Sequence, residues 1–224
     1  MSWLLKSSIG RKFIMALSGC CMVLFLLFHM SMNLVLVFSA EAYDMICEFL
    51  GTNWYAIVGT MGLAALFLVH IIYAIILTLQ NRKARGADSY ASSSLSDATW
   101  SSKNMFVLGV VILAFLGLHL YDFWYKMQFS ELLHLPGAES KGSVIALALF
   151  KNPVHVILYL IGIGAVWVHL SHGVWSMFQS TGLNGRTWAP RLKVIGYVVA
   201  TIIAVGFAIV PIYCLARAYL CPFA

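Results

Sequence analysis

Histidine is the residue type in this chain with the clearest potential for chemistry, because six of the seven histidines lie within long apolar stretches. An imidazole can bind a metal or transfer a proton, and placing one in a hydrocarbon environment is costly. Polar side chains in such segments therefore tend to mark a functional site. The six candidates are His29, His70, His119, His155, His169 and His172.

Four of these histidines form two pairs when their depth is counted along their apolar segments. His70 and His169 each lie 17 residues after a polar residue at one end and 12 residues before a polar residue at the other end. His29 and His119 lie 17 and 16 residues from the nearest preceding lysine, counted from the opposite end. The five-residue difference predicts two levels about 7 Å apart.

Two imidazoles at one depth on different helices can supply both axial ligands of a b-type haem, so two levels predict two haems. Glycines support this interpretation. Gly59 and Gly162 fall within about 20° of His70 and His169 on a helical wheel. We therefore expect room for a flat ring beside both of these histidines.

Other uses of the histidines stay open at this point. His155 and His169 are 14 residues apart, so one helix could serve two haems, although His29 and His119 would then have no role. His172 could replace His169 as a ligand. A haem-free anchor or transporter that uses the histidines as a proton relay is a further alternative.

The segments that must position these residues are apolar enough to cross a membrane. The chain has 224 residues, of which 62% are hydrophobic and 10% charged, and its mean hydropathy is +0.89. A water-exposed surface normally needs about 25% charge. We predict an all-α integral membrane bundle in a single domain, 1–224, with five transmembrane helices at about 13–38, 55–80, 104–127, 153–179 and 192–216.

The distribution of basic residues predicts the orientation of the bundle. Ten of the 14 Lys and Arg residues fall in the N-terminal segment and in segments 81–103 and 180–193. Basic residues favour the cytoplasmic side, so we expect a cytoplasmic N-terminus and an outside C-terminus. The Ser-rich stretch 89–94 is expected to contact a cytoplasmic partner. No stripe of basic and aromatic residues suggests nucleic-acid binding.

Four stretches of the sequence resemble a known family. They are His29-Met-Ser-Met-Asn33, Asn81-Arg-Lys-Ala-Arg85, Ser102-Lys-Asn-Met105 with His119-Leu120, and His169-Leu-Ser-His-Gly-Val-Trp-Ser-Met-Phe-Gln179. Over nearly its whole length the chain resembles the cytochrome b558 membrane anchor of succinate dehydrogenases and fumarate reductases, in its single-chain, five-helix, dihaem form. The resemblance implies that His29 and His119 bind the distal haem b, and that His70 and His169 bind the proximal haem b.

The resemblance also implies partners and a reaction. A flavoprotein subunit would interconvert succinate and fumarate, an iron–sulfur subunit would relay electrons, and this chain would exchange them with a quinone, expected to be menaquinone, in the inner (cytoplasmic) cell membrane. The sequence has no GxGxxG, no P-loop and no cysteine spacing for an iron–sulfur cluster. Flavin and clusters would therefore belong to other chains. The anchor of another respiratory complex, such as a hydrogenase or formate dehydrogenase, is the alternative.

Quinone chemistry also needs a group that handles protons near a haem edge. The candidates are Glu41, Asp44 and Glu48, which follow the first apolar segment, and Asp122, which lies one turn beyond His119. A structural hydrogen bond is the alternative role for Asp122. Some members of the resembled family carry a carboxylate two residues before the ligand in helix four. This chain has Trp167 there, which does not favour a proton route across the membrane.

Overall fold

The computed structural model of the chain describes residues 7–51, 53–85, 100–180, 182–183 and 185–220. These residues form helices joined by turns, with no β-strand among them. The Ser-rich stretch 89–94, expected to contact a partner, lies outside the described residues.

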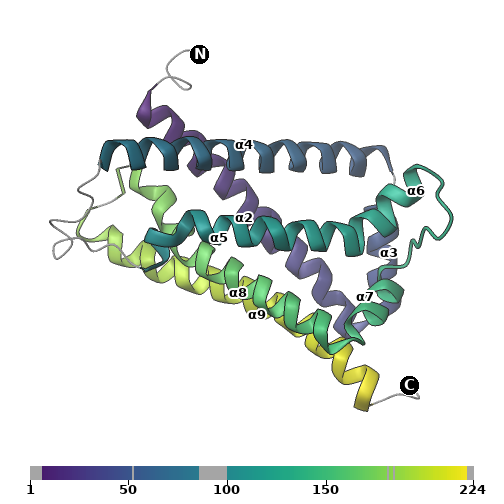
Figure 1. The fold of residues 1–224 in the computed structure, drawn as a ribbon. Coiled ribbons are helices and arrows are strands. Elements are labelled where there is room, and N and C mark those ends of the chain that lie inside the picture. Colours follow the sequence, from purple (N-terminus) through teal and green to yellow (C-terminus); the bar gives the residue numbers. More distant parts are fainter. Residues whose placement is uncertain (1–6, 52, 86–99, 181, 184, 221–224) are drawn as a thin grey trace.

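Five helical segments are long and apolar enough to cross a membrane, which confirms the predicted all-α membrane bundle and makes the chain a multi-pass membrane protein. Each observed segment covers its predicted range. The first segment begins at one end of the bundle, and the last segment ends at the other (Figure 1). The segments are α2 (Ser8–Phe38), α4 (Trp54–Arg85), α5 (Trp100–His119) continued by the π-helix η2 (Leu120–Phe129) and α6 (Ser130–Leu132), α8 (Pro153–Ser176) continued by the 3₁₀-helix η3 (Met177–Ser180), and α9 (Trp188–Leu220).

Two further short helices, α3 (Ala40–Phe49) and α7 (Gly142–Phe150), lie at the same end of the bundle (Figure 1). The extended backbone of Ser39 ends α2, and its side chain accepts a hydrogen bond from the backbone N–H of Ala42 at 3.1 Å. Ser39 therefore acts as the N-cap of α3. Neither short helix was expected from the apolar runs, because each is too short to cross a membrane.

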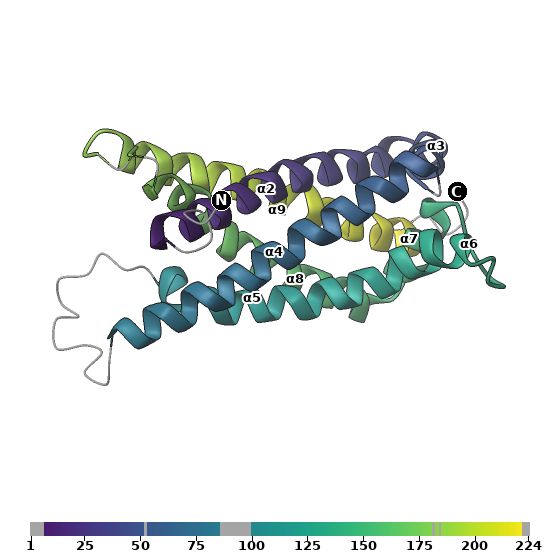
Figure 2. The same cartoon turned by 90° about the horizontal axis from the view of Figure 1, so that it is seen from above.

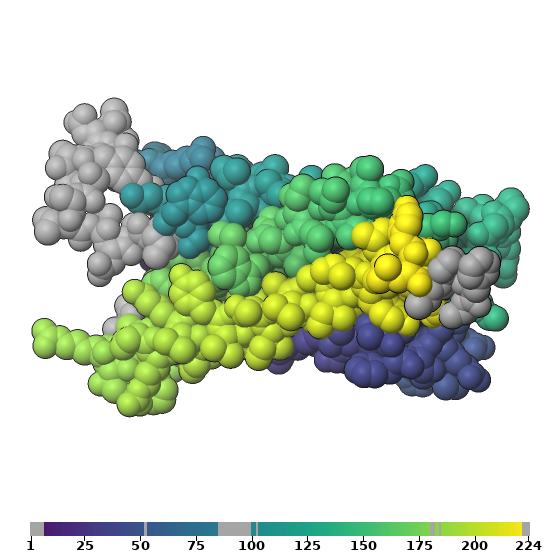
Figure 3. Space-filling model, turned by 90° about the horizontal axis from the view of Figure 1, so that it is seen from below, coloured from purple at the N-terminus to yellow at the C-terminus, as the bar shows by residue number. Residues whose placement is uncertain are grey.

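Helices α8 and α9 pack along each other, and Figure 3 shows α9 running along one face of the bundle beside α8. Helix α2 packs on α9, and α5 packs on α8. Helix α4 differs from the others. It packs mainly on α2 and barely touches α5, and it crosses α2 obliquely (Figures 1 and 2). None of the residues in its most apolar window is buried.

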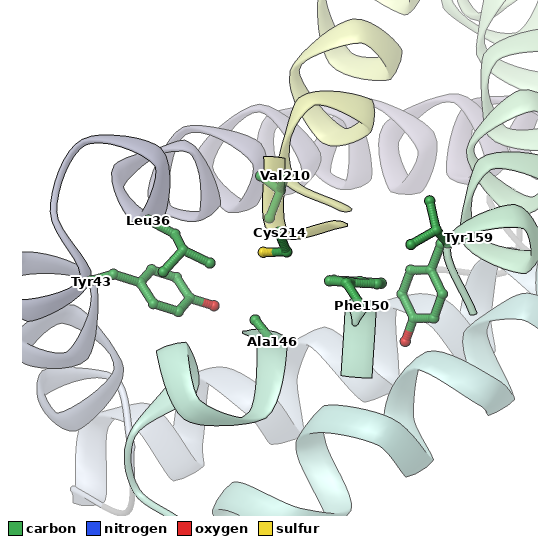
Figure 4. Close-up of a cluster of buried hydrophobic side chains, with 8 residues drawn as sticks. Leu36, Tyr43, Ala146, Phe150, Tyr159, Val210 and Cys214 are labelled. Carbon is green, nitrogen blue, oxygen red and sulfur yellow. The ribbon is translucent and has the colours of Figure 1, made fainter. Parts of the chain in front are cut away.

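A cluster of buried side chains joins α2, α3, α7, α8 and α9 at the end where the short helices lie (Figure 4). It consists of Leu36, Tyr43, Ala146, Phe150, Val156, Tyr159, Val210 and Cys214. A second, smaller cluster joins α8 and α9 further along, and it consists of Leu170, Val174, Ala200 and Ile203. The short helices thus complete the packing at one end of the bundle.

Gly59 and Gly162 were expected to leave open space for a flat ring beside the histidines. A Cβ at Gly59 would meet nothing within 4 Å, but Gly59 is exposed and lies about 16 Å from His70 along α4, so this open space is not beside His70. A Cβ at Gly162 would overlap the ring of Phe115, which packs from α5 onto α8. The expectation that Gly162 leaves room for a prosthetic ring is therefore wrong, because an aromatic side chain already fills this position.

Replacing Gly162 with Ala should destabilise the bundle, because the new methyl group would push against a rigid aromatic ring. Overpacking of this kind costs about 1–3 kcal/mol. The matched control is Gly164→Ala on the same helix, where a Cβ would meet nothing within 4 Å. Thermal unfolding in detergent should show a lower Tm for the first variant only, and equal Tm values would contradict the packing described here.

Candidate functional site: two pairs of histidines

The first pair consists of His29, in the middle of α2, and His119, the last residue of α5. Their ring centroids are 5.7 Å apart and their planes are inclined at 79°. Two imidazoles bonded to opposite sides of one metal ion, at about 2 Å per bond, have ring centres roughly 6 Å apart. The spacing of this pair therefore fits two axial ligands of one iron.

Aromatic side chains surround this pair. Phe25 stacks on His29, with centroids 5.3 Å apart and planes inclined at 13°, and Phe207 lies 5.6 Å from the same ring. Phe123 lies 5.3 Å from His119 and Tyr159 lies 6.2 Å from it. This apolar, aromatic environment suits a hydrophobic macrocycle and leaves the imidazoles few polar partners.

The second pair consists of His70 on α4 and His169 on α8. Their imidazoles lie close enough to interact electrostatically. Helix α2 approaches His70 closely, since a Cβ at Gly19 would stand 3.5 Å from the Cε1 atom of His70. Only the first pair is in direct ring contact, whereas His169 lies within electrostatic range of both His70 and His172.

The Nδ1 atom of each imidazole distinguishes the two members of the second pair. Nδ1 of His70 lies 3.0 Å from the hydroxyl oxygen of Ser18, whereas Nδ1 of His169 is buried without a hydrogen-bond partner. A metal-binding histidine normally uses one nitrogen for the metal and the other for a supporting hydrogen bond. His70 has this arrangement already.

Asn33 links His29 to the short helix α3. Its side-chain amide nitrogen donates to the backbone oxygen of His29 at 2.8 Å and lies 3.4 Å from Nδ1 of the same residue. The hydroxyl of Tyr43 donates to the side-chain oxygen of Asn33 at 3.2 Å. Burial raises the pKa of Tyr43, so this hydroxyl keeps its proton. The stretch from His29 to Asn33 was singled out in the sequence, but the contact with Tyr43 was not predicted.

The two pairs are further apart than predicted. His70 meets α2 at Ser18, eleven residues before His29, which corresponds to about 16 Å along the helix axis instead of about 7 Å. The prediction compared depths counted from the ends of separate helices. Because α4 crosses α2 obliquely (Figure 2), residues at equal counts do not lie at equal heights.

The remaining histidines occupy other positions. The Nδ1 atoms of His155 and His172 are buried without hydrogen-bond partners. His172 lies edge-on to Trp175, with ring centroids 5.1 Å apart. His155 is 14 residues before His169, about 21 Å along α8. His134 lies outside the long helices, with a positive φ of 52°.

A bare metal ion needs several protein ligands close together. Among the residues that the structure describes, no three or more His, Cys, Asp or Glu side chains gather as a metal site. Two axial imidazoles are sufficient when a porphyrin supplies the other ligands of the iron. The paired histidines and the aromatic side chains around the first pair are therefore compatible with a haem.

The three candidate carboxylates after α2 lie together. Glu41, Asp44 and Glu48 line a pocket of about 390 Å³ together with Ser140 and Lys141. Asp44 also has a structural role, since its carboxylate accepts hydrogen bonds from the backbone N–H of Ser143 at 2.9 Å and from its hydroxyl at 2.7 Å. It thereby caps the N-terminus of α7 and ties this helix to α3.

Asp122 lies apart from this pocket, in the π-helix η2. Its side chain is only 3% exposed and accepts a hydrogen bond from the hydroxyl of Tyr159 at 2.9 Å. This is the structural hydrogen bond that the sequence left open as an alternative. Because Tyr159 also contacts His119, the carboxylate is connected to the first histidine pair through one side chain.

Basic side chains lie at the opposite end from α3 and α7, where α4 ends and α9 begins. The guanidinium of Arg82 lies 5.6 Å from the ring centroid of Phe106, and the ammonium of Lys193 lies 5.1 Å from that of Trp175. These cation–π contacts hold two of the cations against the ends of the helices. The bundle thus has a basic end near His70 and His169 and an acidic end near His29 and His119.

No protein-family model, curated protein or solved structure matches this chain.

Replacing Asp44 with Ala should lower the stability of the acidic end, because α7 would lose its cap. Loss of such a cap costs about 1 kcal/mol. The matched control is Glu48→Ala, which removes an exposed carboxylate from the same helix. A Tm of Asp44→Ala in detergent that equals the Tm of the control would contradict a capping role.

Replacing Tyr159 with Phe should also destabilise the protein, because Asp122 would remain buried without its hydroxyl donor. An unsatisfied buried polar group costs about 1–3 kcal/mol. Tyr213→Phe serves as the control, since Tyr213 packs against the same cluster. Urea or thermal unfolding should separate the two variants, and the hydrogen bond is unimportant if both behave like the unmodified protein.

Proposed function

We propose that this chain is the dihaem cytochrome b membrane subunit of a succinate:quinone oxidoreductase, working as a succinate dehydrogenase or fumarate reductase. The observation that carries this proposal is the arrangement of four partly buried histidines from four helices, one pair in ring contact and one within electrostatic range, about 16 Å apart along α2. His29 and His119 would bind the distal haem, and His70 and His169 the proximal haem. Each pair offers two imidazoles and no further metal ligand.

When bound, the two haems would carry single electrons between the ends of the bundle, which is the chemistry that such cofactors supply. The protein supports this task by burying the ligands among apolar and aromatic side chains, since burial and ligand identity set haem potentials. Phe25 and Phe207 do this around His29.

The two ends of the bundle differ in a way that suits different partners. The basic end, near the proximal pair, would face the cytoplasm and contact an iron–sulfur subunit, which in turn contacts the flavoprotein subunit. The sequence carries no motif for flavin or for an iron–sulfur cluster. The chain would therefore anchor these subunits to the inner cell membrane and carry the haems.

The acidic end is our candidate for the quinone site. Glu41, Asp44 and Glu48 line a pocket there, and Asp122 connects to the distal pair through Tyr159. Quinone reduction takes up protons as well as electrons, so carboxylates near the distal haem could deliver them. Menaquinone is the expected quinone because of the family resemblance.

The decisive experiment is a pyridine-haemochrome assay, with a redox-difference spectrum, on the complex purified from membranes. We expect two b haems per chain. Alanine in place of either member of a pair should remove one haem and leave the other. His155→Ala is the matched control, because His155 is buried on the same helix as His169 but belongs to neither pair.

Three outcomes would count against the proposal. A chain without haem would be an anchor or transporter of another kind. A haem lost from His155→Ala but kept in His29→Ala would mean that the ligands are paired differently. Two haems in a complex that succinate cannot reduce would favour the anchor of another respiratory complex.

A further inference from the structure

Ser18 makes a polar contact between α2 and α4 inside the membrane-spanning part of the bundle. It is 3% exposed, and its hydroxyl oxygen lies 3.0 Å from Nδ1 of His70. The same hydroxyl donates a hydrogen bond to the backbone oxygen of Met15 at 3.0 Å. Both contacts are within ordinary hydrogen-bond distance.

These two contacts favour one position for the proton of His70. A serine hydroxyl has one hydrogen to donate, and the backbone oxygen of Met15 lies within reach of it. With that hydrogen directed to Met15, the Ser18 oxygen accepts from His70, which favours the tautomer that carries the proton on Nδ1. Nε2 then carries the free lone pair, and this is the tautomer that a metal ligand bonding through Nε2 requires.

Neither His29 nor His169 has an oxygen acceptor at its Nδ1 atom. The amide group that faces Nδ1 of His29 at 3.4 Å belongs to Asn33 and is a donor. Nδ1 of His169 has no hydrogen-bond partner. In the proximal pair, Nδ1 of His70 therefore faces an oxygen, and Nδ1 of His169 does not.

We propose that Ser18 is a positioning residue for the proximal haem, which fixes the tautomer and orientation of His70 and lowers the midpoint potential of that haem; this inference rests on the proposed function. An imidazole whose N–H is hydrogen-bonded to an oxygen is a stronger electron donor to the metal. A stronger donor favours the ferric state, so the potential falls.

The weak packing of α4 makes this contact important for orientation. Helix α4 packs mainly on α2, and none of the residues in its most apolar window is buried. The other polar contacts that the structure describes for α4 lie ten or more residues from His70: Thr60 donates to Gln128 at 3.0 Å, and Arg82 lies against the ring of Phe106. Ser18 is therefore the polar neighbour that acts on the direction of His70. A buried hydrogen bond between two membrane-spanning helices contributes to their association.

The test is a redox titration of both haems in the purified complex that carries Ser18→Ala. The midpoint potential of the proximal haem should rise, while that of the distal haem stays the same. The proximal haem is identified by its absence in His169→Ala. Ser18→Thr keeps a hydroxyl and should restore the original potential. Ser31→Ala is the matched control, because Ser31 lies on the same helix and bonds only the backbone oxygen of Leu27 at 2.8 Å.

An unchanged proximal potential in Ser18→Ala, or an equal change in both haems, would overturn the proposal. If Ser18→Ala fails to retain the proximal haem, Ser18→Cys takes its place, since a thiol has nearly the same shape and is a weaker acceptor. A raised proximal potential in that variant supports the role of Ser18, and an unchanged one overturns it. The haem content of the unmodified complex is measured first. Absence of haem there refutes both proposals, whereas two haems with no effect of Ser18 refute only this one.

Discussion

Polar groups that lie within a membrane must find partners inside the protein, and this constraint underlies the whole structure. Helices satisfy their own backbone, so five of them can cross the membrane without difficulty. Their imidazoles are not satisfied in the same way. Nδ1 of His155, His169 and His172 are buried without hydrogen-bond partners, and each such atom has a cost. A ligand held by the paired histidines would account for His169, while His155 and His172 lie outside the pairs.

The loose attachment of α4 follows from the same constraint. Apolar side chains gain little by leaving lipid for one another, so membrane helices associate through close packing and polar contacts. Helices α8 and α9 have close packing along their length. Helix α4 has a polar contact instead, between His70 and Ser18, and it has open space beside Gly59. A cofactor that bridges α4 to α8 would complete its packing.

The sequence predicted those features that depend on composition and on single residues. The five membrane-crossing helices follow from apolar length, and counting along them matched His29 with His119, whose rings are in contact in the structure. It did not predict the short helices α3 and α7, because nine or ten residues leave no distinct hydropathy signal. Asp44 was predicted as a candidate for handling protons, and only the tertiary fold brings its carboxylate to Ser143.

The spacing of the two pairs was underestimated because helix tilt is set by packing between helices and is not encoded in residue counts. Gly162 was misjudged for a related reason. Its lack of a side chain predicted open space, but small residues in membrane bundles often admit a neighbouring side chain, here Phe115.

The π-helix that begins directly after His119 affects how this span is compared with other proteins. Each turn of η2, from Leu120 to Phe129, takes in about one residue more than an α-turn. A homologous span that continues as a regular α-helix would align with this one only if a gap is opened after His119. Without that gap, every later residue would be assigned to the wrong side of the helix by about 100° per missing position, and Asp122 would be matched with a residue that faces elsewhere.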